Sequence, residues 1–137
     1  MKNKVKLDDV IMALEMSNID TQTYYNKKTN EILYCFNNNK EASTYTEDHE
    51  YNADVIFMFG YNSKDDYEIM RDFIYTIKNS DLRQNLFDSI EGRGAFRTFK
   101  DTIYDFGIED SWYKYMDNRY RQIAIVWCND NEIAYEK

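Results

Sequence analysis

The sequence predicts an α+β fold made of an N-terminal helix, a small antiparallel β-meander of about three strands and a four-helix C-terminal half. Two patterns support this prediction. Short runs of β-branched and aromatic residues occur between residues 23 and 59, and apolar residues recur at helical spacing near the N-terminus and throughout the second half. The 137 residues fit a single domain, 1–137, because no repeat or linker divides the chain.

The first predicted element is a short amphipathic helix. Its apolar residues fall at i, i+3, i+4 and i+7 and are Leu7, Val10, Ile11 and Leu14. Asp8 is the expected N-cap, and Leu7 and Met12 are placed for a hydrophobic staple.

Strands are predicted next in the chain. Residues 23–25 and 32–36 favour a β-hairpin whose turn is closed by Asn30, since asparagine tolerates a positive φ. Residues 37–54 are polar and without period, which predicts a long loop. The apolar run at residues 55–59 predicts a buried third strand.

Four helices and a short edge strand at residues 132–135 are expected after that run. The expected helix starts are Ser63 in a capping box with Asp66, then Ser80 or Asp81, then Ala95, and finally Asp110 or Ser111. On the last helix, Asp117 and Arg121 are spaced for an i, i+4 ion pair.

The chain must break between the second and third of these helices. Ile90 and Phe96 are six residues apart, about 600° along a helix, so one straight helix leaves them about 240° out of phase. Two interior glycines would also destabilise a continuous helix by about 1 kcal/mol each relative to alanine. We therefore expect a turn at Gly92 and Gly94 and a new helix from Ala95.

This turn supplies the candidate site, an anion- or partner-binding group formed by Arg93, Gly94, Arg97 and Lys100. Cations near a helix N-terminus are disfavoured by the helix dipole, so an anion should offset them. One source of that anion is a carboxylate of this chain, and residue types alone favour this source. The other source is an external ligand or partner that is held by free N–H groups and arginine.

Overall charge narrows the classes of partner. The formal net charge is -8, which argues against non-specific nucleic-acid binding, because such binding depends on neutralising phosphates. No apolar run approaches the ~20 residues of a membrane helix, so no membrane partner is expected.

Cys35 and Cys128 are far apart in sequence and predict two free thiols in a cytoplasmic protein.

The sequence gives little support for a catalytic site or a metal-binding site. His49 is the single histidine and lies among acidic residues of the polar loop, so a His/Cys zinc site is not expected. The Gly-Arg-Gly-Ala stretch at residues 92–95 matches neither a Walker loop nor a dinucleotide fingerprint. We expect no catalytic residue, no metal and no cofactor. The residues favour a protein that is not an enzyme and leave an enzyme open as an alternative.

Residues 92–101, Gly-Arg-Gly-Ala-Phe-Arg-Thr-Phe-Lys-Asp, resemble the signature of a bacterial uncharacterised protein family, number 0158 in its series. The resemblance extends to residues 5–9, 70–74, 112–113 and 123–128. Asn30 stands where the family pattern has glycine, and Thr98 where a third arginine is common. The resemblance implies no activity.

The leading hypothesis is a non-enzymatic binding or regulatory domain that contacts an anionic ligand or a protein partner through residues 92–100. One alternative is a small enzyme acting on a phosphorylated small molecule, with the same turn as phosphate cradle and Asp101 or Glu91 as acid/base. A second alternative is a protein–protein interaction module that uses exposed aromatic residues or a sheet edge.

Overall fold

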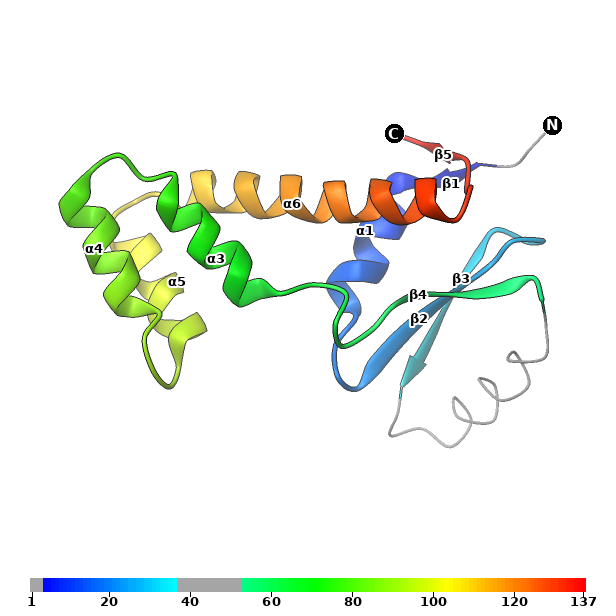
Figure 1. Cartoon of the computed structure of the whole chain (residues 1–137), viewed down its shortest axis with the longest axis horizontal. Helices are drawn as coiled ribbons and strands as arrows, with labels where there is room; N and C mark the ends of the chain where they lie inside the picture. Colours follow the sequence, from blue (N-terminus) through cyan, green and yellow to red (C-terminus); the bar gives the residue numbers. More distant parts are fainter. Residues whose placement is uncertain (1–3, 37–52) are drawn as a thin grey trace. The chain divides into compact units, whose positions relative to one another are not determined.

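The structure is a computed structural model that describes residues 4–36 and 53–137 (Figure 1). Its elements are β1 (Val5–Lys6), α1 (Leu7–Met16), β2 (Thr21–Asn26), β3 (Glu31–Phe36), β4 (Val55–Phe59), α3 (Asp66–Tyr75), α4 (Ser80–Ser89), α5 (Ala95–Asp105), α6 (Glu109–Asp130) and β5 (Tyr135–Glu136). They confirm the predicted α+β class, including the N-terminal helix, the three antiparallel strands and the four C-terminal helices.

The chain groups into two compact units. The first comprises Met1–Lys64 with Tyr120–Lys137, and the second is Asp65–Arg119, so α6 contributes its first half to the second unit and the rest to the first. The expectation of a single domain stays a prediction. We call Asp65–Arg119 the helical unit.

The three-stranded sheet of the first unit has the order β3-β2-β4. A meander would place β3 in the middle, so that detail of the prediction is wrong: β4 pairs with β2, with Tyr25 opposite Ile56. Hairpin loops commonly have two to five residues, whereas residues 37–54 separate β3 from β4, so these two strands need not be neighbours. The Thr23 hydroxyl at the centre of β2 accepts a hydrogen bond from the Phe59 amide at 3.2 Å.

The β2–β3 hairpin confirms the predicted turn. Asn30 has a φ of 63°, in the left-handed region that asparagine tolerates. Its side-chain oxygen accepts a hydrogen bond from the Tyr25 hydroxyl, and Asn26 Oδ1 accepts one from the Lys28 amide at 2.9 Å. Side-chain oxygens therefore satisfy polar groups that the tight turn leaves without strand partners.

Helix α1 buries the predicted face but begins differently. Its N-cap is Lys6 without a side-chain hydrogen bond, so Asp8 is not the cap. The staple is also absent, since Leu7 is fully buried and Met12 is 56% exposed. Short strand β1 immediately precedes the helix and pairs in parallel with β5, which fixes the entry of the chain into α1.

The second half of α6 and strand β4 complete the core of the first unit. The Trp127 indole donates to the Phe57 carbonyl at 3.2 Å and packs edge-on against Tyr25, with ring centroids 5.7 Å apart. Only Met58 and Phe59 of β4 are buried, so the prediction of a wholly buried strand is wrong.

The helical unit is held by a cluster of aromatic rings. Phe73 of α3, Phe99 of α5 and Trp112 of α6 meet in edge-to-face pairs whose centroids lie 4.9–6.4 Å apart. Such contacts add about 0.5–1.5 kcal/mol per pair beyond the area they bury. Because the three rings come from three helices, they fix α3, α5 and α6 of this unit against one another.

Three of the predicted helix starts are shifted by local hydrogen bonds. Asp65 caps α3 by accepting from the Glu68 amide, while the Ser63 hydroxyl accepts from the Gly60 amide instead. Asn79 caps α4 by accepting from the Leu82 amide, and α6 begins at Glu109. Each shift is one or two residues.

Two sequence expectations concern other parts of the chain. Most of the predicted loop, including His49, lies outside the described residues. Among the helices that the structure describes, none combines the length and the apolar character needed to cross a membrane.

Candidate functional site

The turn between α4 and α5 adopts the predicted break. Gly92 and Gly94 have φ values of 82° and 72°, and α5 begins at Ala95 with Gly94 as its N-cap. A Cβ added at either glycine would meet nothing within 4 Å. The glycines are therefore required for their left-handed backbone, not for close packing, and the surface around them is open.

The break lies between the buried end of α4 and the buried face of α5, but Phe96, on which the phase argument was built, is not part of that face. Ile90 is buried at the end of α4, and Phe99 and Ile103 are buried on α5. Phe96, expected on the same inward face, is 47% exposed. The face of α5 thus starts one turn later than predicted, because its first turn lies beyond the core of the helical unit.

The structure leaves all three cations of the turn exposed. No carboxylate of the described residues lies within ion-pair distance of Arg93, Arg97 or Lys100, and none of the three makes a side-chain hydrogen bond there. The internal carboxylate that residue types favoured is therefore not found in the described part of the chain. We call Arg93, Gly94, Arg97 and Lys100 the turn surface.

Helix α5 also lacks the usual compensation at its N-terminus. It has no side-chain cap and no acidic residue in its first turn, whereas α1, α3, α4 and α6 each carry at least one acid there. The first-turn N–H groups of a helix have no partner within the helix. The first turn of α5 therefore has neither a capping side chain nor an acidic residue to offset its exposed Arg97, and Arg93 is exposed just before the helix.

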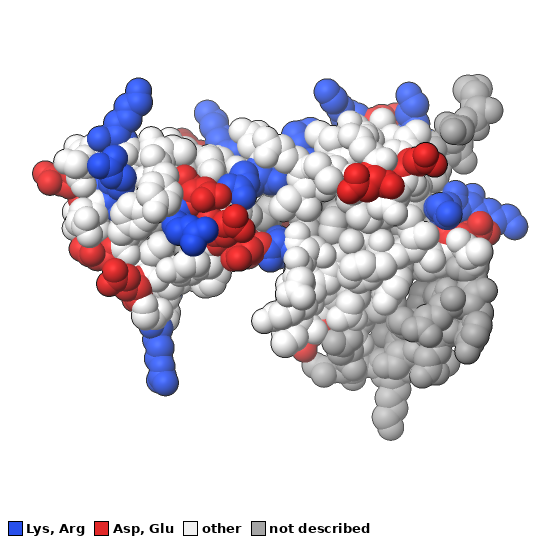
Figure 2. All heavy atoms as spheres, viewed as in Figure 1, with Lys and Arg blue, Asp and Glu red and all other residues white. Residues whose placement is uncertain are grey.

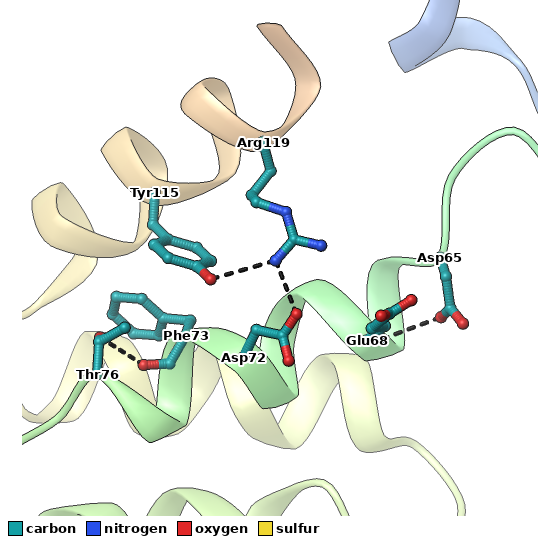
Figure 3. A network of polar contacts seen from close by, with 7 residues as sticks. All are labelled: Asp65, Glu68, Asp72, Phe73, Thr76, Tyr115 and Arg119. Atoms are coloured by element: carbon teal, nitrogen blue, oxygen red, sulfur yellow. Dashed lines mark hydrogen bonds and ion pairs between the residues drawn. The ribbon is translucent and has the colours of Figure 1, made fainter. Parts of the chain in front are cut away.

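A paired arginine elsewhere in the helical unit provides a contrast. Arg119 on α6 donates to Asp72 Oδ2 on α3 at 2.8 Å and to the Tyr115 hydroxyl at 3.2 Å (Figure 3). The hydrogen bond to Asp72, followed by that to Tyr115, raises the pKa of Arg119 above its usual value. This arginine therefore has a structural role. The predicted Asp117–Arg121 ion pair does not form among the described residues.

Charges of both signs alternate on the face shown in Figure 2, without a continuous basic surface. A nucleic-acid-binding face would gather lysine and arginine along one stripe. The turn surface is instead a local group of three cations within an acidic chain.

A cavity of about 370 Å³ lies between α5 and the start of α6. It is lined by Lys100, Asp101, Ile103, Tyr104, Glu109, Trp112 and Tyr113. Lys100 belongs to both this α5–α6 cavity and the turn surface, but Arg93 and Arg97 do not line the cavity.

Other chemistry-bearing side chains have structural roles. Cys128 is buried, and burial raises the pKa of its thiol to about 11, so it stays protonated near neutral pH. Cys35 is also a buried free thiol, as predicted. No group of three or more His, Cys, Asp or Glu side chains arranged to hold a metal ion occurs in residues 4–36 and 53–137.

The family model described as "Uncharacterised protein family (UPF0158)" matches residues 4–136. The chain belongs to this family. It is also similar to a UPF0158 protein of Pseudomonas aeruginosa, with 27% identity over 66 residues. That stretch is 47% of this chain and 43% of the relative, so the chain matches less than half of the relative's length. No solved structure gives a significant match.

The UPF0158 match spans the sequence of both compact units and includes the turn surface and the α5–α6 cavity. The family description names no activity, in agreement with what the resemblance implied. Function must therefore be inferred from the geometry of these sites.

Sequence reasoning missed Glu109 and the Arg119–Asp72 pair. Asp110 or Ser111 was expected to start α6, which left Glu109 outside the helix. The pair joins residues 47 positions apart in sequence, so no local spacing signals it. Both features depend on how α3, α5 and α6 pack within the helical unit.

Proposed function

We propose that this UPF0158 protein is a non-enzymatic binding or regulatory domain whose turn surface holds an anionic group of a ligand or protein partner. The observation that carries the proposal is the set of exposed, unpaired cations Arg93, Arg97 and Lys100 at a helix start without cap or acid. The helix dipole and the free amides favour an anion at that place. Arginine adds planar pairs of donors that match a carboxylate or phosphate.

The shape of the turn favours binding over catalysis. Open space surrounds the Cβ positions of both glycines, so an anion can approach without being enclosed. A phosphate-processing enzyme would need a concave site that excludes water and presents an acid or base beside the phosphate. Arg93 and Arg97 do not line the α5–α6 cavity, so they are not part of a concave site. Their position on an open surface supports recognition of an anionic group carried on a partner's surface.

We also propose that residues 92–101 are the family's signature stretch and that the protein is bacterial and cytoplasmic. The left-handed glycines and the exposed cations give this stretch the properties of a recognition loop on a fixed scaffold. The two buried free thiols, Cys35 and Cys128, are compatible with a reducing compartment.

The test compares two double charge reversals. Arg93→Glu with Arg97→Glu removes the turn surface, and Arg71→Glu with Lys78→Glu changes the net charge equally at exposed, unpaired cations elsewhere in the helical unit. Binding of a labelled hexaglutamate peptide and of inorganic phosphate is measured at 50 and 300 mM salt, and thermal unfolding is recorded separately.

We expect the wild type to bind at least one probe in a salt-dependent manner. The turn variant should lose at least about tenfold in affinity and stay folded, and the control should stay within about twofold. If the turn variant unfolds and the wild type binds neither probe, the cations are structural and the proposal is wrong. An equal loss of affinity in both variants would show that binding depends only on net charge, and this result would also contradict the proposal.

A further inference from the structure

A cavity of about 320 Å³ in the first unit is formed by the β2–β3 hairpin turn and the loop that follows α6. We call it the hairpin cavity. Its charged side chains are Lys27 and Lys28 of the turn and Glu132 of the loop. All three residues are exposed, so a dissolved molecule can reach their charged groups. None of the described residues that line this cavity belongs to the turn surface or lines the α5–α6 cavity.

Hydrogen bonds fix the hairpin wall of the cavity. Asn26 Oδ1 accepts from the Lys28 amide at 2.9 Å, which holds the backbone of the turn. The side-chain oxygen of Asn30 accepts from the hydroxyl of the buried Tyr25, whose ring packs edge-on against Trp127. The NH₂ group of Asn30 has no hydrogen-bond partner in the part of the chain that the structure describes. The wall is therefore ordered before a ligand arrives and keeps donors available for it.

Glu132 on the opposite element has an unusual backbone conformation. Its φ is 56°, and it closes a Schellman motif in which the Ile133 amide donates to the Cys128 carbonyl at 2.8 Å. Glycine is the usual residue at this position, because a Cβ is strained where φ is positive. Residues held in such conformations are concentrated at functional sites. The strained position of Glu132 therefore places a carboxylate on the cavity where a glycine would form the same loop more easily.

The charges of the hairpin cavity do not neutralise one another. Within residues 4–36 and 53–137, the side chains of Lys27, Lys28 and Glu132 form neither an ion pair nor a hydrogen bond. Two ammonium groups and one carboxylate leave an excess of one positive charge. A ligand with charges of both signs and a net charge of -1 complements all three groups through charge-assisted hydrogen bonds.

We propose that the hairpin cavity binds a free amino dicarboxylate, that is, an α-amino acid with an acidic side chain. Its two carboxylates accept from the ammonium groups of Lys27 and Lys28 and from the NH₂ group of Asn30, and its ammonium group donates to Glu132. The volume of about 320 Å³ is at the small end of the usual range for ligand pockets and suits a molecule of this size. The proposal does not depend on the function proposed for the turn surface, which belongs to the helical unit.

The test uses the 137-residue chain and three probes that differ in one charged group. L-Glutamate carries two carboxylates and an ammonium group, glutarate lacks the ammonium group, and L-glutamine lacks the second carboxylate. Amide chemical shifts of the labelled protein are followed during each titration. We expect L-glutamate to bind with shifts centred on residues 27–30 and 132–134, and the other two probes to bind at least about tenfold more weakly.

Matched variants separate the cavity from general charge effects. Glu132→Gln removes the carboxylate and keeps the length of the side chain, and Glu136→Gln removes an exposed carboxylate of β5 that does not line the cavity. We expect Glu132→Gln to weaken L-glutamate at least about tenfold without weakening glutarate, because glutarate has no ammonium group for Glu132. Glu136→Gln should change the affinity for either probe less than about twofold. Lys28→Gln should weaken both L-glutamate and glutarate.

A third change at the strained position separates binding from folding. Glu132→Gly removes the carboxylate and suits the positive φ, so its Tm should equal or exceed that of the wild type while L-glutamate binds at least about tenfold more weakly. This variant also tests the site should Glu132→Gln unfold.

The proposal is overturned if L-glutamate does not bind at 10 mM, or if glutarate binds as tightly as L-glutamate. It is also overturned if Glu132→Gln and Glu136→Gln weaken L-glutamate equally, or if Glu132→Gly binds it as the wild type does.

Discussion

Reversing the charge of Arg97 should stabilise the protein while it weakens binding at the turn surface. Gly94 is the N-cap of α5, so Arg97 is the third residue of the helix and lies in its first turn. A cation in the first turn interacts unfavourably with the helix dipole, and an anion there interacts favourably. Each interaction changes the stability of the protein by about 0.3–1 kcal/mol at low salt. Arginine and glutamate have similar helix propensities, so backbone preference contributes little.

The magnitude follows from these two contributions. Removing the unfavourable cation and adding a favourable anion together give about 0.6–2 kcal/mol, and the exposure of Arg97 places the value near the lower end. We expect Arg97→Glu to raise the free energy of unfolding by about 0.6–1 kcal/mol and Tm by a few degrees. Arg97→Gln, which removes the cation alone, should give about half of this gain.

The assay is urea unfolding at 20 mM and 1 M salt, combined with amide hydrogen exchange in α5 as a local measure. At 1 M salt the Debye length is about 3 Å, so the gain should largely disappear. Arg71→Glu on α3 serves as a control outside a first turn. The reasoning is refuted if Arg97→Glu destabilises the protein by more than about 1 kcal/mol, or if its effect is the same at both salt concentrations.

The remaining predictions concern the turn backbone, the ion pair and the buried thiol. Gly94→Ala should destabilise by about 1–2 kcal/mol in denaturant unfolding because a φ of 72° strains alanine, and Gly94→Asn should cost clearly less, whereas equal costs would point to packing. Asp72→Asn should cost no more than about 1 kcal/mol, with a smaller effect in high salt, since the pair is partly exposed; a larger, salt-independent loss would contradict this. Because burial raises the pKa of Cys128 to about 11, the unfolded thiol ionises first, so stability should fall as pH rises from about 9 to 11. Burial also raises the pKa of Tyr25 and Tyr34, so replacing Cys128 with alanine should reduce that pH dependence without abolishing it, and an unchanged profile in the variant would show that the thiol does not contribute.

The sequence alone determined the elements and the break that positions the candidate site. Helical periods are properties of neighbouring residues, so the face of α1 could be derived from spacing: Leu7, Val10 and Leu14 are buried and Ile11 is half-buried. The turn was predicted from the two glycines and from the phase of Ile90 and Phe96; the structure confirms the turn and its left-handed glycines, although Phe96 itself is exposed. The left-handed Asn30 of the hairpin was predictable for the same local reason.

Local competition between neighbouring hydrogen-bond acceptors was harder to resolve. Asp65 and Asn79, rather than nearby serines, cap α3 and α4. Several adjacent residues can each act as caps, and the choice depends on small differences in backbone geometry.

Only the tertiary structure decided which polar groups have partners. The position of β4 beside β2 and the contact of Arg119 with Asp72 join residues far apart in sequence, and neither leaves a local pattern. The same is true of the charges of Arg93, Arg97 and Glu132, which are exposed and have no ion pair within the described part of the chain. Composition tells which charges a chain carries, but packing in three dimensions determines which of them are already neutralised within the fold and which remain for a ligand.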